Sequence, residues 1–221
     1  MKTNVLNLYY YFKFDFKNAG IIFFLPLLIL FISIIVLFVD TKDNEQIYNI
    51  VIAFQGTYLP VSGWALMYRL KEVYEEGAYE ALAPYYAKNI IFDISRYYTL
   101  HLIGIVLWII CFSIKYDISI IWPVNIVHFL LLSLFFMMFG TVLMVLIKNI
   151  EFSLTIFFIY VIIEVATLGE YMPWPHIFLF QNPFWEPFIQ VKLIMILLYI
   201  VLMFVITILM FRKNERKHSP N

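Results

Sequence analysis

Residues 118–147 read ISIIWPVNIVHFLLLSLFFMMFGTVLMVLI, and this run of thirty residues contains no Asp, Glu, Lys or Arg. An α-helix needs about 20 apolar residues to cross a bilayer core of roughly 30 Å. The run is longer than one straight crossing requires, and it contains Pro123, a residue type that is favoured in the first turn of a helix. We therefore expect its first residues to lie at the membrane interface and the helix to begin near Pro123.

The rest of the chain has the same character, since 63% of its residues are hydrophobic and only 14% are charged. Soluble domains are about half apolar and a quarter charged. The apolar residues form continuous runs rather than the short alternating strands of a membrane β-barrel. The sequence therefore predicts an all-α integral membrane protein with a single transmembrane domain over residues 1–221. Six spans are expected, at about 20–39, 47–70, 97–114, 118–147, 152–169 and 190–211.

The positive charges predict how these spans are oriented. With six crossings, twelve of the fifteen Lys and Arg residues fall on one side of the membrane, and the exceptions are Lys42, Lys115 and Lys192. Lys and Arg accumulate on the cytoplasmic side of membrane proteins, so both termini are expected to be cytoplasmic. Residues 1–19 are expected to form an amphipathic helix in the inner interface, or alternatively a basic flank that only fixes orientation. Residues 212–221 are expected to be a cytoplasmic tail.

One polar segment, residues 71–96, separates the second and third expected spans. Its acidic residues recur at helical spacing on one side, and smaller or apolar residues occupy another side. The acidic residues are Glu72, Glu75, Glu76 and Glu80. A short, charged, helix-forming loop of this kind is expected to contact a partner in the cytoplasm.

Motifs for catalysis and for cofactors are missing from the sequence. None of the seven glycines is followed by Lys, and no pair has the spacing of a phosphate-binding loop. The four histidines are isolated, with no H-E-x-x-H and no Cys/His pairing, so a metal site is not expected. The single cysteine, Cys111, lies in an expected span. We therefore expect no cofactor, no metal and no enzymatic activity in this chain.

In its expected topology and in residues 71–96, the chain resembles the permease subunits of ABC-2 type (type V) ABC transporters. The loop of that family typically reads acidic-x-Gly-x-x-Glu-x-Leu, followed by a turn and a basic amphipathic helix that enters span three. The residues that match it here are Glu75, Gly77, Glu80 and Leu82. Residues 88–96 are similar to the basic helix. Two departures are Ala78, where the family commonly has Thr, and Pro84, which comes about two residues early.

The resemblance implies a function and a set of partners. A separate ATPase subunit would supply the missing phosphate loop, and a second permease half would complete a dimer in a bacterial plasma membrane. The expected function is export of a hydrophobic or amphipathic compound, such as a peptide, an antibiotic or a lipid-like molecule. A nucleic-acid partner is not expected. The alternative is a non-transporting immunity or sensor protein that docks a cytoplasmic partner through residues 71–96.

The same resemblance implies a coupling helix that docks on the ATPase. The docking residues would be Glu75, Glu76, Gly77, Glu80, Leu82 and Pro84. Gly77 can supply a backbone break after span two, because glycine adopts conformations that other residues avoid. Pro84 is expected to end the coupling helix, because its ring disfavours helical geometry at Ala83.

The outer loop between the fifth and sixth expected spans, residues 170–187, is rich in proline and aromatic residues. The resemblance implies short outer helices here that dip into the membrane and cap the pathway. The alternative is an aromatic belt that anchors a structured loop at the interface.

Polar residues inside the spans are further candidates for a functional role. Gln55, Thr57 and Ser62 are expected to form interhelical hydrogen bonds beside Gly56 and Gly63, since small residues allow helices to pack closely.

Glu164 is the acidic residue of the fifth expected span, and a carboxylate within a span costs roughly 2–3 kcal/mol on insertion scales. His128 and Asn125 lie at a similar depth, so these three are the candidate pathway residues. Glu164 is expected either to pair with His128 or to line the outer mouth of the pathway. If the fifth helix ends early, Glu164 would lie instead in the headgroup region.

Overall fold

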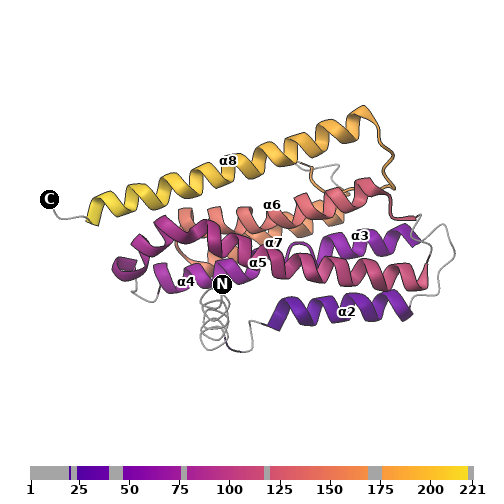
Figure 1. The fold of residues 1–221 in the computed structure, drawn as a ribbon, viewed down its shortest axis with the longest axis horizontal. Helices are drawn as coiled ribbons and strands as arrows, with labels where there is room; N and C mark the ends of the chain where they lie inside the picture. Colours follow the sequence, from indigo (N-terminus) through magenta and orange to yellow (C-terminus); the bar gives the residue numbers. More distant parts are fainter. Residues whose placement is uncertain are drawn as a thin grey trace, which may run out of the picture.

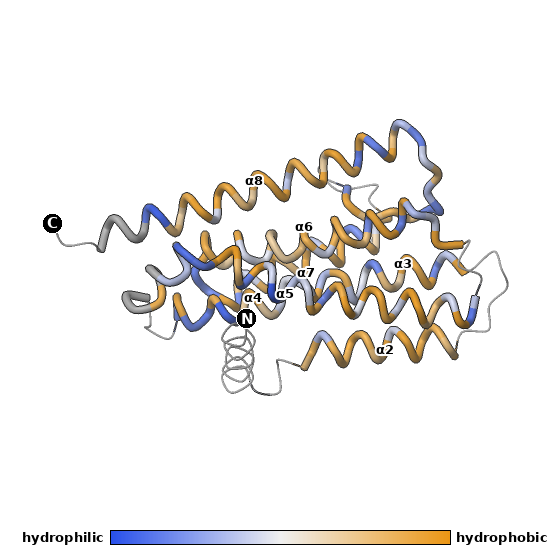
Figure 2. Tube along the Cα trace, in the orientation of Figure 1, coloured by the Kyte–Doolittle hydropathy of each residue, from blue (hydrophilic) through white to orange (hydrophobic). Residues whose placement is uncertain are grey.

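The computed structural model describes the backbone of residues 20, 24–39, 47–75, 79–116, 120–168 and 176–218. Within these residues all regular structure is helical, as the sequence predicted (Figure 1). The helices are α2 (Leu25–Val39), α3 (Ile47–Thr57), α4 (Ser62–Tyr74), α5 (Tyr79–Lys115), α6 (Pro123–Ile147), α7 (Ile150–Thr167) and α8 (Pro187–His218). They lie lengthwise beside one another, with apolar residues along their lengths (Figure 2).

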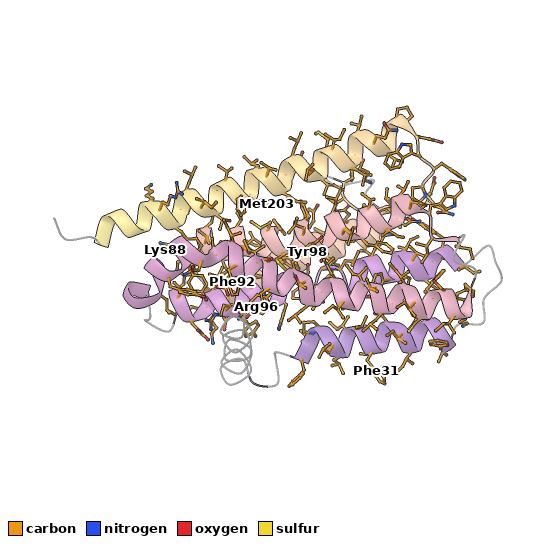
Figure 3. The ribbon with its side chains drawn as sticks, in the orientation of Figure 1. Phe31, Lys88, Phe92, Arg96, Tyr98 and Met203 are labelled. Atoms are coloured by element: carbon orange, nitrogen blue, oxygen red, sulfur yellow. The ribbon has the colours of Figure 1, made fainter. Side chains whose placement is uncertain are left out.

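Five segments of the described chain are helical, long and apolar enough to cross a membrane, so the structure is that of a multi-pass membrane protein. They are residues Ile47–Tyr74, Lys88–Lys115, Pro123–Ile147, Ile150–Thr167 and Pro187–Lys213. The shorter helix α2 also exposes apolar side chains, such as Phe31 with 62% of its surface exposed (Figure 3). The expected apolar helices over 97–114, 118–147, 152–169 and 190–211 are therefore present.

Within the first expected span, over 20–39, the structure describes helix α2 at Leu25–Val39, and residues 21–23 lie outside the described chain. Helix α2 has 15 residues, which is about 22 Å at 1.5 Å per residue and less than a bilayer core of roughly 30 Å. Its carboxyl end is held by Lys115, whose ammonium donates to the carbonyls of Leu37 and Phe38 at 2.7 and 3.1 Å. A sixth complete crossing stays a prediction. The expected interfacial helix over residues 1–19 lies outside the described residues.

The fourth span begins where the sequence predicted. Trp122 is extended and Pro123 occupies the first turn of α6. Proline fits there because its missing N–H would have no partner in the first turn. The helix ends at Ile147, and the next residue, Lys148, has a left-handed backbone conformation. Asn149 then caps α7 by accepting a hydrogen bond from the N–H of Phe152 at 2.9 Å. Helices α6 and α7 are therefore joined by a two-residue turn.

The second span is two helices and not the continuous helix expected over residues 47–70. Helix α3 ends at Thr57, α4 begins at Ser62, and Pro60 lies in the turn between them. Proline has no N–H for the helical ladder and disfavours helical geometry at the residue before it. Shorter-range hydrogen bonds replace the ladder, such as that from the N–H of Val61 to the carbonyl of Tyr58 at 3.2 Å. Because these residues are buried, the break lies inside the bundle.

The prediction that Pro84 ends a separate coupling helix is wrong. Helix α5 is continuous from Tyr79 through Pro84 to Lys115. Proline at this position removes one backbone donor only five residues after the helix begins. The following turns bury Tyr86 and Ile90, and this packing favours continuation of the helix.

Helix α6 is central to the packing and contacts α4, α5, α7 and α8. A Cβ added to Gly63 of α4 would lie 2.7 Å from the backbone oxygen of Phe136 in α6, so only glycine permits this approach. Beside it, the Ser62 hydroxyl donates to the carbonyl of Ser133 at 2.7 Å. Interhelical roles predicted for Ser62 and Gly63 are confirmed. The same prediction for Thr57 is wrong, because its hydroxyl donates within its own helix, to the carbonyl of Ala53.

Candidate functional site

The most unusual feature of the bundle is a non-helical segment buried within it. Residues 176–186 precede α8 and form no helix. Three of them, Ile177, Phe178 and Leu179, expose only 0%, 2% and 5% of their surfaces. We call residues 177–179 the buried segment. Outside a helix its backbone groups do not bond to one another in a ladder, and an unsatisfied group inside a membrane protein costs several kcal/mol.

Side chains accept the hydrogen bonds of all three N–H groups in the buried segment. One carboxylate oxygen of Glu164, in the last turn of α7, accepts from the N–H of Ile177 at 2.6 Å and from that of Phe178 at 2.9 Å. The amide oxygen of Gln55, in α3, accepts from the N–H of Leu179 at 3.2 Å. Helices α7 and α3 therefore supply the acceptors for all three N–H groups of the segment.

The three carbonyl groups of the buried segment also have side-chain partners. His128 Nε2 lies 2.7 Å from the carbonyl oxygen of Ile177, and because a carbonyl only accepts, this nitrogen carries the proton. Lys192 Nζ donates to the carbonyl of Phe178 at 2.6 Å. The carbonyl of Leu179 accepts from its neighbours in α3, which are Gln55 Nε2 at 3.4 Å and the Tyr48 hydroxyl at 3.5 Å.

Together these five side chains form what we call the side-chain cage: Tyr48, Gln55, His128, Glu164 and Lys192. They come from α3, α6, α7 and α8, so the cage exists only when these four helices are assembled. Glu164 and Lys192 bring opposite charges to the N–H and C=O sides of the same segment. Charged groups at membrane depth are costly and are usually paired or bound to backbone groups, as both are here.

The candidate pathway residues converge on this segment. Glu164 and His128 both bind Ile177, one at its N–H and the other at its carbonyl. Glu164 is fully buried. Asn125 joins the same network, because its side-chain oxygen accepts from the Tyr48 hydroxyl at 3.2 Å. Its side-chain nitrogen donates to Asn182 at 3.4 Å, so Asn125 holds the chain just beyond the buried segment.

Sequence reasoning missed part of the cage. The sequence did not indicate a functional role for Tyr48 or Lys192. Lys192 was noted only as one of the three basic residues that do not fall on the expected cytoplasmic side. Its position in the first turns of a long apolar helix was the available signal, because a charged residue there needs a partner. Gln55 was expected to bind another helix, whereas it binds the buried segment. The short outer helices expected between the last two spans are absent from residues 176–186, and residues 169–175 lie outside the described chain.

The predicted docking residues are less fully described. Glu75 follows α4, and its carboxylate accepts a hydrogen bond from the N–H of Ile150, the first residue of α7. Leu82 is half-buried in α5. The backbone of Glu80 and Pro84 lies in α5, but their side chains are outside the described part, as are Glu76 and Gly77 altogether.

Buried charges gather at the predicted cytoplasmic end, where Figure 3 labels Arg96. Arg96 pairs with Asp93 at 3.2 Å within α5, and both side chains are almost completely buried. Arg69 pairs with Glu72 at 3.3 Å within α4. Burial raises the pKa of the nearby Tyr86 hydroxyl above its usual range, which keeps it protonated. Breaking a buried pair leaves an uncompensated charge, so loss of either partner should destabilise the fold.

A cavity of about 380 Å³ lies beside the break in the second span. Its walls come from α2, α3, α5 and α7 and include Ile29, Phe54, Val61, Trp108 and Phe158. Almost all of these side chains are apolar, so the cavity suits a hydrophobic molecule. Among the described residues, no three His, Cys, Asp or Glu side chains gather as metal ligands would.

The chain matches no protein-family model, no curated protein and no solved structure in comparisons with each.

Proposed function

We propose that this chain is the membrane-spanning permease subunit of an ATP-binding-cassette transporter and that a separate ATPase subunit hydrolyses the ATP. The observation that carries the proposal is the buried segment. Non-helical backbone at membrane depth is tolerated where protein buries it or where it lines a cavity, and transporters use such segments at their substrate sites. The match of Glu75, Gly77, Glu80 and Leu82 to the coupling loop supports the same function.

In this proposal the buried segment closes the outer end of the pathway. Its hydrogen bonds run to the tips of side chains on four helices, so a relative movement of those helices releases it without unfolding any of them. The break between α3 and α4 provides a place for such a movement, because a turn bends more easily than a continuous helix. The apolar cavity beside the break supports a hydrophobic or amphipathic substrate. Two such chains in a bacterial plasma membrane would form the complete pathway.

Co-purification tests the proposal directly. The chain is expressed with an affinity tag in its native host and purified in mild detergent, and the bound proteins are identified by mass spectrometry. We expect an ATP-binding subunit with a phosphate loop to co-purify and its ATPase activity to be retained. Glu80→Lys should reduce the bound ATPase, because it reverses a charge in the docking segment. Glu186→Lys, the same reversal at an exposed residue near the other end of the bundle, should not.

Two outcomes would overturn the transporter proposal. One is a purified chain with no ATP-binding subunit. The other is a cytoplasmic partner without a phosphate loop that is lost on the Glu80 substitution, which would favour the immunity or sensor alternative.

A further inference from the structure

Helix α7 has a specific contact at its amino end. The Glu75 carboxylate, just past the carboxyl end of α4, accepts from the N–H of Ile150, the first residue of α7. One residue earlier, the ring of Tyr74 lies 5.9 Å from the ammonium of Lys148 in the turn before α7. A carboxylate at the amino end of a helix is favoured by the helix dipole. The end of α4 is therefore tied to the start of α7.

The opposite end of α7 holds the buried segment. Glu164 lies fourteen residues after Ile150, about 21 Å along a helix. Its carboxylate binds the N–H groups of Ile177 and Phe178. No proline or glycine interrupts the sequence between Ile150 and Thr167, and helices bend sharply at such residues. A shift of one end of α7 is therefore transmitted to the other.

The second span has no such rigid connection. Gln55 of α3 also binds the buried segment, but the turn around Pro60 separates α3 from α4. A displacement of α4 therefore reaches the segment through α7 more directly than through α3. Glu164 of α7 accepts from two of the three N–H groups of the segment, so a shift of α7 loosens these two hydrogen bonds.

We infer that Glu75 is a positioning residue, which links the chain after α4 to Glu164 through helix α7 and thereby sets how tightly the buried segment is held. This inference rests on the proposed function for the source of the movement, an ATPase that acts on residues 71–96. The linkage itself is a property of the chain alone.

Hydrogen exchange measures the linkage where it acts. The full-length chain is placed in lipid nanodiscs without any ATPase, and deuterium uptake is followed by mass spectrometry for the backbone amides of Ile177 and Phe178. Glu164→Ala should raise their exchange at least tenfold, because it removes their acceptor. Glu75→Ala, at the far end of α7, should raise it about two- to fivefold, the size expected from losing one carboxylate at a helix amino end.

Two further variants separate positioning from general stability. Glu75→Gln keeps an acceptor oxygen and should restore most of the protection. Glu151→Ala removes the same charge from the first turn of α7 without touching the contact to α4, and it should leave the exchange of the segment unchanged. Amides in the middle of α6 report on the whole fold, and their exchange should not change in Glu75→Ala, Glu75→Gln or Glu151→Ala. Glu164→Ala also lowers the overall stability, so it serves as the reference for full loss of the acceptor.

The inference fails if Glu75→Ala frees only the first turn of α7 and leaves the Ile177 and Phe178 amides at the level of Glu151→Ala. It also fails if combining Glu75→Ala with Glu164→Ala raises exchange beyond Glu164→Ala alone, because a link that acts through Glu164 has no effect once Glu164 is gone. Since no ATPase is present, failure here leaves the permease proposal intact. Failure to co-purify an ATPase likewise leaves the linkage intact.

Discussion

Replacing Glu164 by Ala should destabilise the protein more than any exposed substitution on α7. The change removes the acceptor of two buried N–H groups, those of Ile177 and Phe178. Each hydrogen bond to a charged group is worth about 1.5–3 kcal/mol net, which gives about 3–6 kcal/mol for two. Water that enters the vacated space restores some of the lost hydrogen bonding, so we expect the free energy of unfolding to fall by an amount near the lower end of this range, about 3 kcal/mol. Glu164→Gln keeps one acceptor oxygen, and because neutral bonds are about half as strong, it should lose roughly half as much.

Thermal unfolding of the purified chain in detergent measures this loss. For a chain of this length, 1 kcal/mol corresponds to a shift of about 2–4 °C in the unfolding midpoint, so Glu164→Ala should unfold about 6–12 °C below the wild type. The unfolding midpoint of Glu164→Gln should lie between those of the wild type and Glu164→Ala. The control is Glu151→Ala, which removes an exposed carboxylate from the same helix. The reasoning is refuted if Glu164→Ala unfolds at the same temperature as the control, or if Gln is the more damaging substitution.

Three other predictions follow from the orientation and the packing. A cysteine at Glu170 should react with an impermeant thiol reagent outside intact cells and one at Lys213 only after the membrane is opened; the reverse pattern would contradict the predicted orientation. Gly63→Ala should lower the free energy of unfolding by about 1–3 kcal/mol, because its Cβ would lie 2.7 Å from a backbone oxygen. Gly56→Ala is the milder control, because its Cβ meets only a side chain at 3.1 Å. Equal melting temperatures of the two variants would show that α4 moves away freely. Pro60→Ala should extend the second-span helix and reduce transport while raising thermal stability, and unchanged transport would mean that the break is not used for movement.

Three of the prolines show how far local sequence rules reach. Pro123 starts α6, as its position after an apolar lead-in predicted. Pro60 interrupts the second span, although the apolar run around it reads as one crossing. Pro84, which was expected to end a helix, lies inside α5. The ring has the same local effect each time, but packing of the neighbouring turns decides whether the helix starts, breaks or continues.

Sequence alone determined the class of the protein, the places of most of its apolar helices and the close approach at Gly63. These features depend on bilayer-length apolar runs and on residue size, which are local properties. The side-chain cage was decided only by the tertiary structure. Glu164 lies 13 residues from Ile177, but Gln55 lies 124 residues from Leu179. The sequence showed that each polar side chain in a span needs a partner, and only the assembly of four helices supplied a buried, non-helical backbone as that shared partner.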